Sequence, residues 1–112
     1  IKALRKAGAS KITMLITYPP IKFPCYAGID FPSQDELATY IDDKKYSEEE
    51  IIENVRRDIG ADFLGYNDPE NLANAIGIQK DSLCFTCTTG NYTSLGITPV
   101  FKTREEMKGE VQ

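Results

Sequence analysis

The chain has 112 residues, which is enough for one small domain. Hydrophobic residues make up 41% of it and charged residues 27%, a composition typical of a folded globular protein. The net charge of −4 argues against nucleic acid as a partner. No apolar run approaches the ~20 residues that a membrane-spanning helix needs, and no signal-peptide pattern opens the chain. We therefore expect a cytoplasmic protein that binds neither nucleic acid nor membrane.

Two absences restrict the chemistry further. The chain contains no His, which excludes His general bases, Ser–His and Cys–His nucleophilic pairs, and mixed Cys/His zinc sites. It also lacks both common glycine-rich phosphate-binding loops. A self-contained catalytic site is difficult to build from the residues that remain.

The first elements predict part of a parallel sheet. Residues 1–7 read as the last turns of a helix that ends at Gly8, so we expect further residues before Ile1. The β-branched, apolar run 11–18 predicts a strand buried on both faces, as in a parallel sheet. A helix followed by a strand at this spacing is typical of the second half of a βαβ unit.

A proline-rich segment follows this strand. Residues 19–33 contain four prolines and one glycine, which excludes a regular helix or a central strand. We call this segment the proline loop and expect it to be extended, rigid and functional. A capping box beginning at Ser33 predicts a short helix as far as about Tyr40.

The remaining elements alternate between helix and strand. A second capping box at Ser47 begins a helix that ends at Gly60, and residues 62–66 predict a strand. Asp68 caps a third helix that ends at Gly77, and residues 82–88 read as another strand or extended piece. The apolar faces of the two helices are expected to be Ile51, Ile52, Val55 and Ile59 in the first, and Leu72, Ala75 and Ile76 in the second. Residues 103–112 form a polar tail.

The three cysteines are the candidate metal ligands. Cys84 and Cys87 form a C-x-x-C pair, and Cys25 lies in the proline loop. Three thiolates without His favour zinc with a fourth donor, or an iron–sulfur cluster with a fourth ligand. The alternative is structural, with Cys84 and Cys87 as small buried residues of a strand and Cys25 as a lone thiol. A redox-active C-x-x-C at the start of a helix is disfavoured, because no helix is predicted after Cys87.

Other polar and aromatic groups have simpler interpretations. The carboxylates at 42–43 and 48–50 suit a magnesium or acid–base site, but solvated groups that complement a helix start explain them better. The tyrosines at 18, 26, 66 and 92 are expected to pack, since no basic groove accompanies them.

Several motifs together resemble one enzyme family. Residues 19–32 (PPIKFPCYAGIDFP) are similar to the PPI-(R/K)-x-P-C-x-x-GID-x-P segment of glutamine phosphoribosylpyrophosphate amidotransferases, also called amidophosphoribosyltransferases. Residues 59–66 resemble that family's IGADSLxY stretch, and residues 72–77 its LxxAIG pattern. Residues 84–92 resemble its C-x-x-C-F-x-G-x-Y ending, except that Thr88 replaces the usual Phe. The motifs follow the family's order along nearly the whole chain.

The resemblance implies a fold and an enzyme. The expected fold class is α/β, part of a type I phosphoribosyltransferase-like, Rossmann-like parallel sheet with C-terminal helices and short strands, and residues 1–112 would form the C-terminal part of that domain. The family makes 5-phosphoribosylamine from phosphoribosylpyrophosphate and glutamine in purine biosynthesis. Its glutaminase domain and phosphoribosylpyrophosphate loop would lie upstream as partners of this segment. We therefore expect a homo-oligomeric enzyme in which these residues are not catalytic alone. The alternative is a free-standing or split-gene module without catalysis.

The resemblance also implies cofactors. In one branch of the family, cysteines at the positions of Cys25, Cys84 and Cys87 bind a [4Fe–4S] cluster, and magnesium serves the transferase reaction. The fourth cluster ligand would lie outside this chain, so these residues alone would hold an incomplete cluster, zinc or no metal. A bound metal would pin the proline loop to the segment that carries the C-x-x-C pair.

Overall fold

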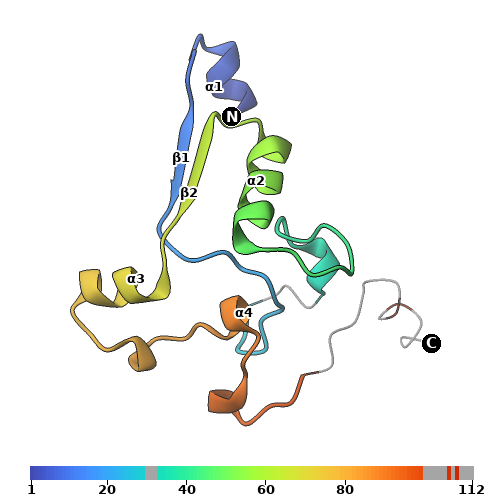
Figure 1. Cartoon of the computed structure of the whole chain (residues 1–112), viewed down its shortest axis with the longest axis vertical. Helices are drawn as coiled ribbons and strands as arrows, with labels where there is room; N and C mark the ends of the chain where they lie inside the picture. The colour runs from blue at the N-terminus through green and yellow to red at the C-terminus, as the bar shows by residue number, and fades with distance from the viewer. Residues whose placement is uncertain (30–32, 100–105, 107, 109–112) are drawn as a thin grey trace.

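A computed structural model describes residues 1–29 and 33–99, together with Glu106 and Lys108. Its elements show the predicted α/β class (Figure 1). In chain order they are α1 (Lys2–Lys6), β1 (Thr13–Ile16), η1 (Gln34–Glu36), α2 (Glu48–Ile59), β2 (Phe63–Tyr66), α3 (Pro69–Ile76), η2 (Lys80–Ser82), α4 (Thr86–Thr89) and η3 (Thr93–Leu95), where η denotes a 3-10 helix. The predicted polar tail, residues 103–112, lies outside the described residues except for Glu106 and Lys108. Within the described part of the chain, no helix is long and apolar enough to cross a membrane.

The two strands form a parallel sheet, as the sequence predicts for residues 11–18. Thr13 lies opposite Phe63, and the pairing continues in register to the ends of both strands. Asp62 fixes the start of this pairing, because its carboxylate accepts hydrogen bonds from the Ile12 amide at 2.7 Å and the Arg5 guanidinium at 2.9 Å. The same carboxylate therefore ties α1 to the sheet.

Burial of β1 differs from the prediction. The expected burial on both faces is wrong for the described residues, because Leu15 is 71% exposed and Phe63 on the neighbouring strand is 52% exposed. Both side chains lie over Gly65 on one face, where a Cβ would meet each of them at 3.1–3.2 Å. A parallel sheet buries both faces only when helices cover both. Here α2 packs against β2, whose Leu64 is buried, and the face that carries Leu15 stays open.

Local signals set the bounds of α2 as predicted. Ser47 and Glu50 form the complete capping box, since each side chain binds the other residue's backbone amide. Gly60 ends the helix in the left-handed conformation at φ 74°. Val55 is the buried residue of its predicted apolar face.

Helix α3 begins and ends as predicted but buries a different face. Asp68 caps it by accepting from the Asn71 amide at 2.8 Å, and Gly77 ends it. The predicted inner residues Ala75 and Ile76 are exposed, whereas Ala73 is buried. The reason is that α3 packs against η2 and not against the sheet.

Two further predictions of local structure are wrong. Ser33 does not cap a helix, because its hydroxyl donates to the Glu36 carboxylate at 2.5 Å, and only the short turn η1 follows. Residues 82–88 do not form a strand. After η2 the chain turns into α4, where Thr88 and Thr89 donate their amides to the carbonyl of Phe85 at 3.0 Å. These local bonds satisfy the backbone groups that a strand would have offered to a neighbour.

The described part of the proline loop, residues 19–29, has neither helix nor strand, as predicted. Pro19, Pro20 and Pro24 are fully buried. Two polar side chains hold the loop from one side. Thr39 donates its hydroxyl to the Ile21 carbonyl at 2.6 Å, and Gln34 of η1 donates its side-chain amide to the Lys22 carbonyl at 3.0 Å. The loop is therefore positioned by the fold over most of its described length.

Candidate cysteine site

The three cysteines lie on two segments that the fold brings together. Cys25 is in the proline loop, Cys84 lies two residues before the start of α4, and Cys87 lies within α4. All three are free thiols; Cys84 is exposed, and the other two are half-buried. The sequence predicts no helix after Cys87, whereas the structure has the four-residue helix α4, which contains Cys87 and continues to Thr89.

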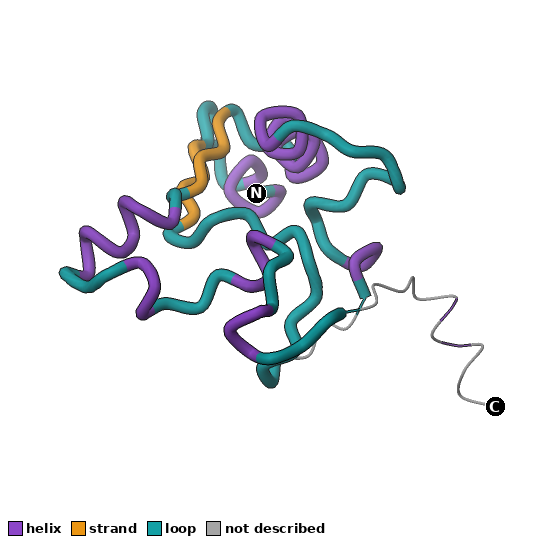
Figure 2. Tube along the Cα trace, turned by 60° about the horizontal axis from the view of Figure 1, so that its bottom comes forward, coloured by secondary structure: helices purple, strands orange, loops and turns teal. Residues whose placement is uncertain are grey.

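Backbone hydrogen bonds join the two segments at Cys87. The amides of Lys22 and Phe23 both donate to the Cys87 carbonyl, each at 2.9 Å. Figures 1 and 2 show α4 beside the loop that leaves β1. One carbonyl therefore anchors the middle of the proline loop to α4.

Tyr18 connects the end of β1 to the same site. Its hydroxyl donates to the Cys84 carbonyl at 2.7 Å and lies 3.9 Å from Cys87 Sγ. Its ring stacks on Phe85, with centroids 5.7 Å apart and planes inclined by 27°. Burial raises the pKa of Tyr18 to about 12, so the hydroxyl stays protonated at neutral pH and remains a donor.

Tyr92 makes the corresponding connection beyond α4. It is 2% exposed, and its hydroxyl donates to the Pro24 carbonyl at 2.5 Å. Tyr26 contacts its ring edge to face, with centroids 5.1 Å apart. The Phe23 ring covers Gly90, whose Cβ position lies 3.0 Å from the nearest ring carbon. These aromatic contacts pack the proline loop against the chain on both sides of Cys25.

The environments of the two C-x-x-C thiols differ. Thr86 lowers the pKa of Cys84 through its side chain, whose oxygen lies 3.5 Å from the sulfur, and through its backbone amide. Burial raises the pKa of Cys87, and the contact between Tyr18 and the thiol opposes that effect. Negative charge on Cys25 or Cys84 raises the pKa of Cys87 further. A bound cation would have the opposite effect on the Cys87 thiol.

The donor chemistry suits a thiolate-bound metal, but the thiols do not form a closed site. Three free cysteines are the donor set that zinc and iron–sulfur clusters prefer. Among the residues described, however, no three Cys, Asp or Glu side chains form a group that could hold a metal ion. The assignment of Cys25, Cys84 and Cys87 as ligands stays a prediction.

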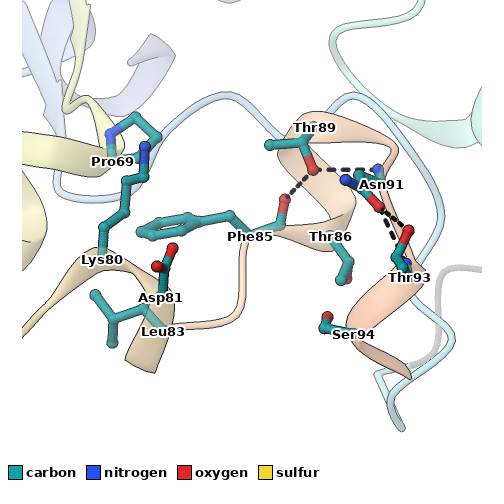
Figure 3. Close-up of a pocket in the computed structure, with 10 residues that line it drawn as sticks. All are labelled: Pro69, Lys80, Asp81, Leu83, Phe85, Thr86, Thr89, Asn91, Thr93 and Ser94. Carbon is teal, nitrogen blue, oxygen red and sulfur yellow. Dashed lines mark hydrogen bonds between the residues drawn. The ribbon is translucent and has the colours of Figure 1, made fainter. Parts of the chain in front are cut away.

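A pocket of polar groups adjoins this site (Figure 3). Its lining residues are Pro69, Lys80, Asp81, Leu83, Phe85, Thr86, Thr89, Asn91, Thr93 and Ser94. Thr89 donates its hydroxyl to the Phe85 carbonyl at 3.1 Å and accepts from the Asn91 amide at 3.2 Å. Asn91 in turn accepts from both the amide and the hydroxyl of Thr93. This chain of bonds fixes the turn between α4 and η3, and with it the position of Tyr92.

The carboxylates make structural contacts. Asp42 accepts from the Lys44 amide and the Tyr46 hydroxyl, which closes a turn before α2. Glu50 completes the capping box, and Glu48 pairs with Lys22 at 3.6 Å. These contacts agree with the structural interpretation of the acidic runs.

Sequence reasoning identified the cysteines but missed the residues that organise them. The sequence predicts only a packing role for Tyr18 and no role for Thr86. The one sequence signal for Thr86 is a hydroxyl two residues after a cysteine. Nothing in the sequence indicates the bond from Tyr18, because 66 residues separate it from its acceptor.

Comparison with known proteins identifies relatives of this chain. No family model matches it. It is 43% identical over 92 residues to the amidophosphoribosyltransferase of Mycobacterium leprae and 44% identical over 92 residues to that of Pyrococcus horikoshii, each match covering 82% of this chain. It is 34% identical over 108 residues, 96% of the chain, to amidophosphoribosyltransferase 2, chloroplastic, of Arabidopsis thaliana.

This chain is homologous to a C-terminal segment of amidophosphoribosyltransferases. The matches confirm the family that the motifs suggested. They cover 16%, 18% and 17% of the three amidophosphoribosyltransferases, so the chain spans about a sixth of the length of these relatives.

Proposed function

We propose that this chain is the C-terminal part of the phosphoribosyltransferase domain of an amidophosphoribosyltransferase, which makes 5-phosphoribosylamine from phosphoribosylpyrophosphate and glutamine. The observation that carries the proposal is identity of 34–44% over 82–96% of the chain to proteins of that name. In this role the chain supplies structure, because it has no His and no phosphate-binding loop of its own. The reacting groups then come from residues outside it.

The open sheet face supports a place within a larger domain. Leu15 and Phe63 would be costly to leave in water in an intact parallel sheet, which normally has helices on both faces. In open α/β sheets, ligands bind outside the carboxyl ends of the strands. Tyr18 and the proline loop follow the carboxyl end of β1. We therefore propose that the proline loop forms part of the wall near the substrate crevice.

Within this proposal, Cys25, Cys84 and Cys87 are three ligands of a [4Fe–4S] cluster, and the fourth ligand lies outside the chain. The docking of the loop that carries Cys25 onto α4, through the Lys22 and Phe23 amides at the Cys87 carbonyl, supports this assignment. A cluster bound here would supply a cross-link between two segments of the domain. We also propose that the complete enzyme uses magnesium, forms a homo-oligomer and is cytoplasmic.

The test uses the complete protein, purified without oxygen from its source. We expect glutamine consumption and pyrophosphate release that each require both substrates, together with bound iron and sulfide. Cys87→Ser should lower the iron content, whereas Ser82→Ala, an exposed residue of η2, should leave it unchanged. A protein that converts neither substrate would overturn the enzymatic proposal and favour a non-catalytic module. Unchanged iron in Cys87→Ser would overturn the ligand assignment alone.

A further inference from the structure

We infer that the proline loop is docked onto the segment 84–92 by a clamp that needs no metal, so that the loop is in place before any metal binds. The clamp consists of Tyr18, Lys22, Phe23 and Tyr92 with the backbone groups that they contact. The inference reverses the expectation that a metal pins the loop. It rests on the proposed function only where the cysteines are assigned as metal ligands.

Three hydrogen bonds of the clamp are made to the main-chain carbonyls of Cys84 and Cys87. Lys22 and Phe23 donate their amides to the Cys87 carbonyl, both at 2.9 Å, and the Tyr18 hydroxyl donates to the Cys84 carbonyl at 2.7 Å. A main-chain carbonyl is the same acceptor whatever its side chain. Replacing either cysteine by Ser therefore keeps all three bonds, and binding of a metal to the thiols does not compete with them.

The aromatic part of the clamp also avoids the thiols. Tyr92 is buried and donates to the Pro24 carbonyl at 2.5 Å, which holds the residue immediately before Cys25. The Phe23 ring lies against Gly90, at 3.0–3.2 Å from its Cβ position. The two loop residues immediately before Cys25 are thus held by a ring contact and by a hydrogen bond to a carbonyl.

The loop is held from its other side as well. Thr39 is buried and donates its hydroxyl to the Ile21 carbonyl at 2.6 Å, and Gln34 donates to the Lys22 carbonyl at 3.0 Å. The main chain around Lys22 is therefore bonded in both directions, to α4 through its amide and to η1 through its carbonyl. This is a preorganised arrangement, in which ordering of the loop is completed by folding and not by ligand binding.

Hydrogen exchange at the Lys22 and Phe23 amides reads the clamp directly, since both amides donate to Cys87. The experiment measures exchange by mass spectrometry in peptides spanning 19–29, using the complete protein as purified without oxygen, after treatment with an iron chelator, and as the variant Cys84→Ser/Cys87→Ser. Phe23→Ala is the reference for an opened clamp, because it removes the ring and no sulfur. We expect about tenfold faster exchange in Phe23→Ala and less than about twofold change after chelation or in the double serine variant.

Exchange that accelerates after chelation or in the serine variant as much as in Phe23→Ala would overturn the inference. If Phe23→Ala does not fold, Tyr92→Phe takes its place, with an expected acceleration of about threefold from the loss of one hydroxyl. Iron analysis of the same samples separates the two proposals. Unchanged iron in the serine variant refutes the ligand assignment and leaves the clamp standing, whereas lost iron with fast exchange refutes the clamp and leaves the ligands standing.

Discussion

Gly90 is the position where one added methyl group most sharply tests the packing of the proline loop. Its φ of 72° lies in the left-handed region, which costs an L-residue about 1–2 kcal/mol. A Cβ there would also meet three carbons of the Phe23 ring at 3.0, 3.1 and 3.2 Å. Overpacking of this kind costs about 1–3 kcal/mol. We therefore expect Gly90→Ala to lower the free energy of unfolding by about 2–5 kcal/mol.

Gly77 provides the matched control for this substitution. It ends α3 at φ 85°, and nothing lies within 4 Å of its Cβ position. Gly77→Ala carries the backbone strain without the clash, so its expected cost is about 1–2 kcal/mol. Urea unfolding of both variants of the purified protein measures the difference.

A double-mutant cycle then isolates the contact between Gly90 and the ring. In the background of Phe23→Leu, Gly90→Ala should cost about 1 kcal/mol less than in the parent, because the smaller side chain yields to the added methyl. Equal losses for Gly90→Ala and Gly77→Ala, with no coupling to residue 23, would refute the packing of the proline loop against Gly90.

Three further outcomes follow from single contacts. Tyr92→Phe should cost about 1–3 kcal/mol in urea unfolding at neutral pH, because the buried Pro24 carbonyl loses its donor. Burial raises the pKa of Tyr92 from 10.0 to about 12. Its contribution to stability is therefore complete below pH 10 and is lost between pH 10 and 12. Thermal unfolding over this pH range should show a smaller loss of stability in Tyr92→Phe than in the parent. Hydrogen bonds from the Ile12 amide and, to a smaller extent, the Arg5 guanidinium lower the pKa of Asp62 from 3.8. The contribution of Asp62 to folding stability is therefore present above pH 3.8 and is lost as the pH falls through the lower pKa of the folded state. Asp62→Asn should weaken this loss of stability in acid. Ser47→Ala should cost about 1 kcal/mol through loss of the α2 cap, a cost that an unchanged urea midpoint would contradict.

The parts of the fold that local sequence determines were predictable. Helix α2 combines a capping box at Ser47, an apolar face around Val55 and a glycine in the left-handed conformation, and all three act within one helix. The apolar, β-branched run 11–18 also predicts the parallel strand, of which residues 13–16 pair with β2. Burial of that strand did not, because it depends on what covers the sheet and not on the strand itself.

The region around the cysteines was predictable in composition but not in conformation. Residues 82–88 include Phe85 and two threonines, residue types that favour strands, yet the amides of Thr88 and Thr89 bond locally to Phe85. The prediction failed because a strand requires a neighbouring strand, whereas the described part of the proline loop donates two backbone amides to a single carbonyl of this segment. The C-x-x-C spacing identifies the cysteines as candidate ligands. The hydrogen bonds that position them join residues far apart in the chain, so the sequence does not predict these bonds.

The most direct test of the account is native mass spectrometry of the protein from its source, purified without oxygen and assayed in the same buffer. We expect one covalent chain several times heavier than 12.5 kDa that carries this sequence and consumes glutamine together with phosphoribosylpyrophosphate. A species of 12.5 kDa that consumes neither substrate would contradict it.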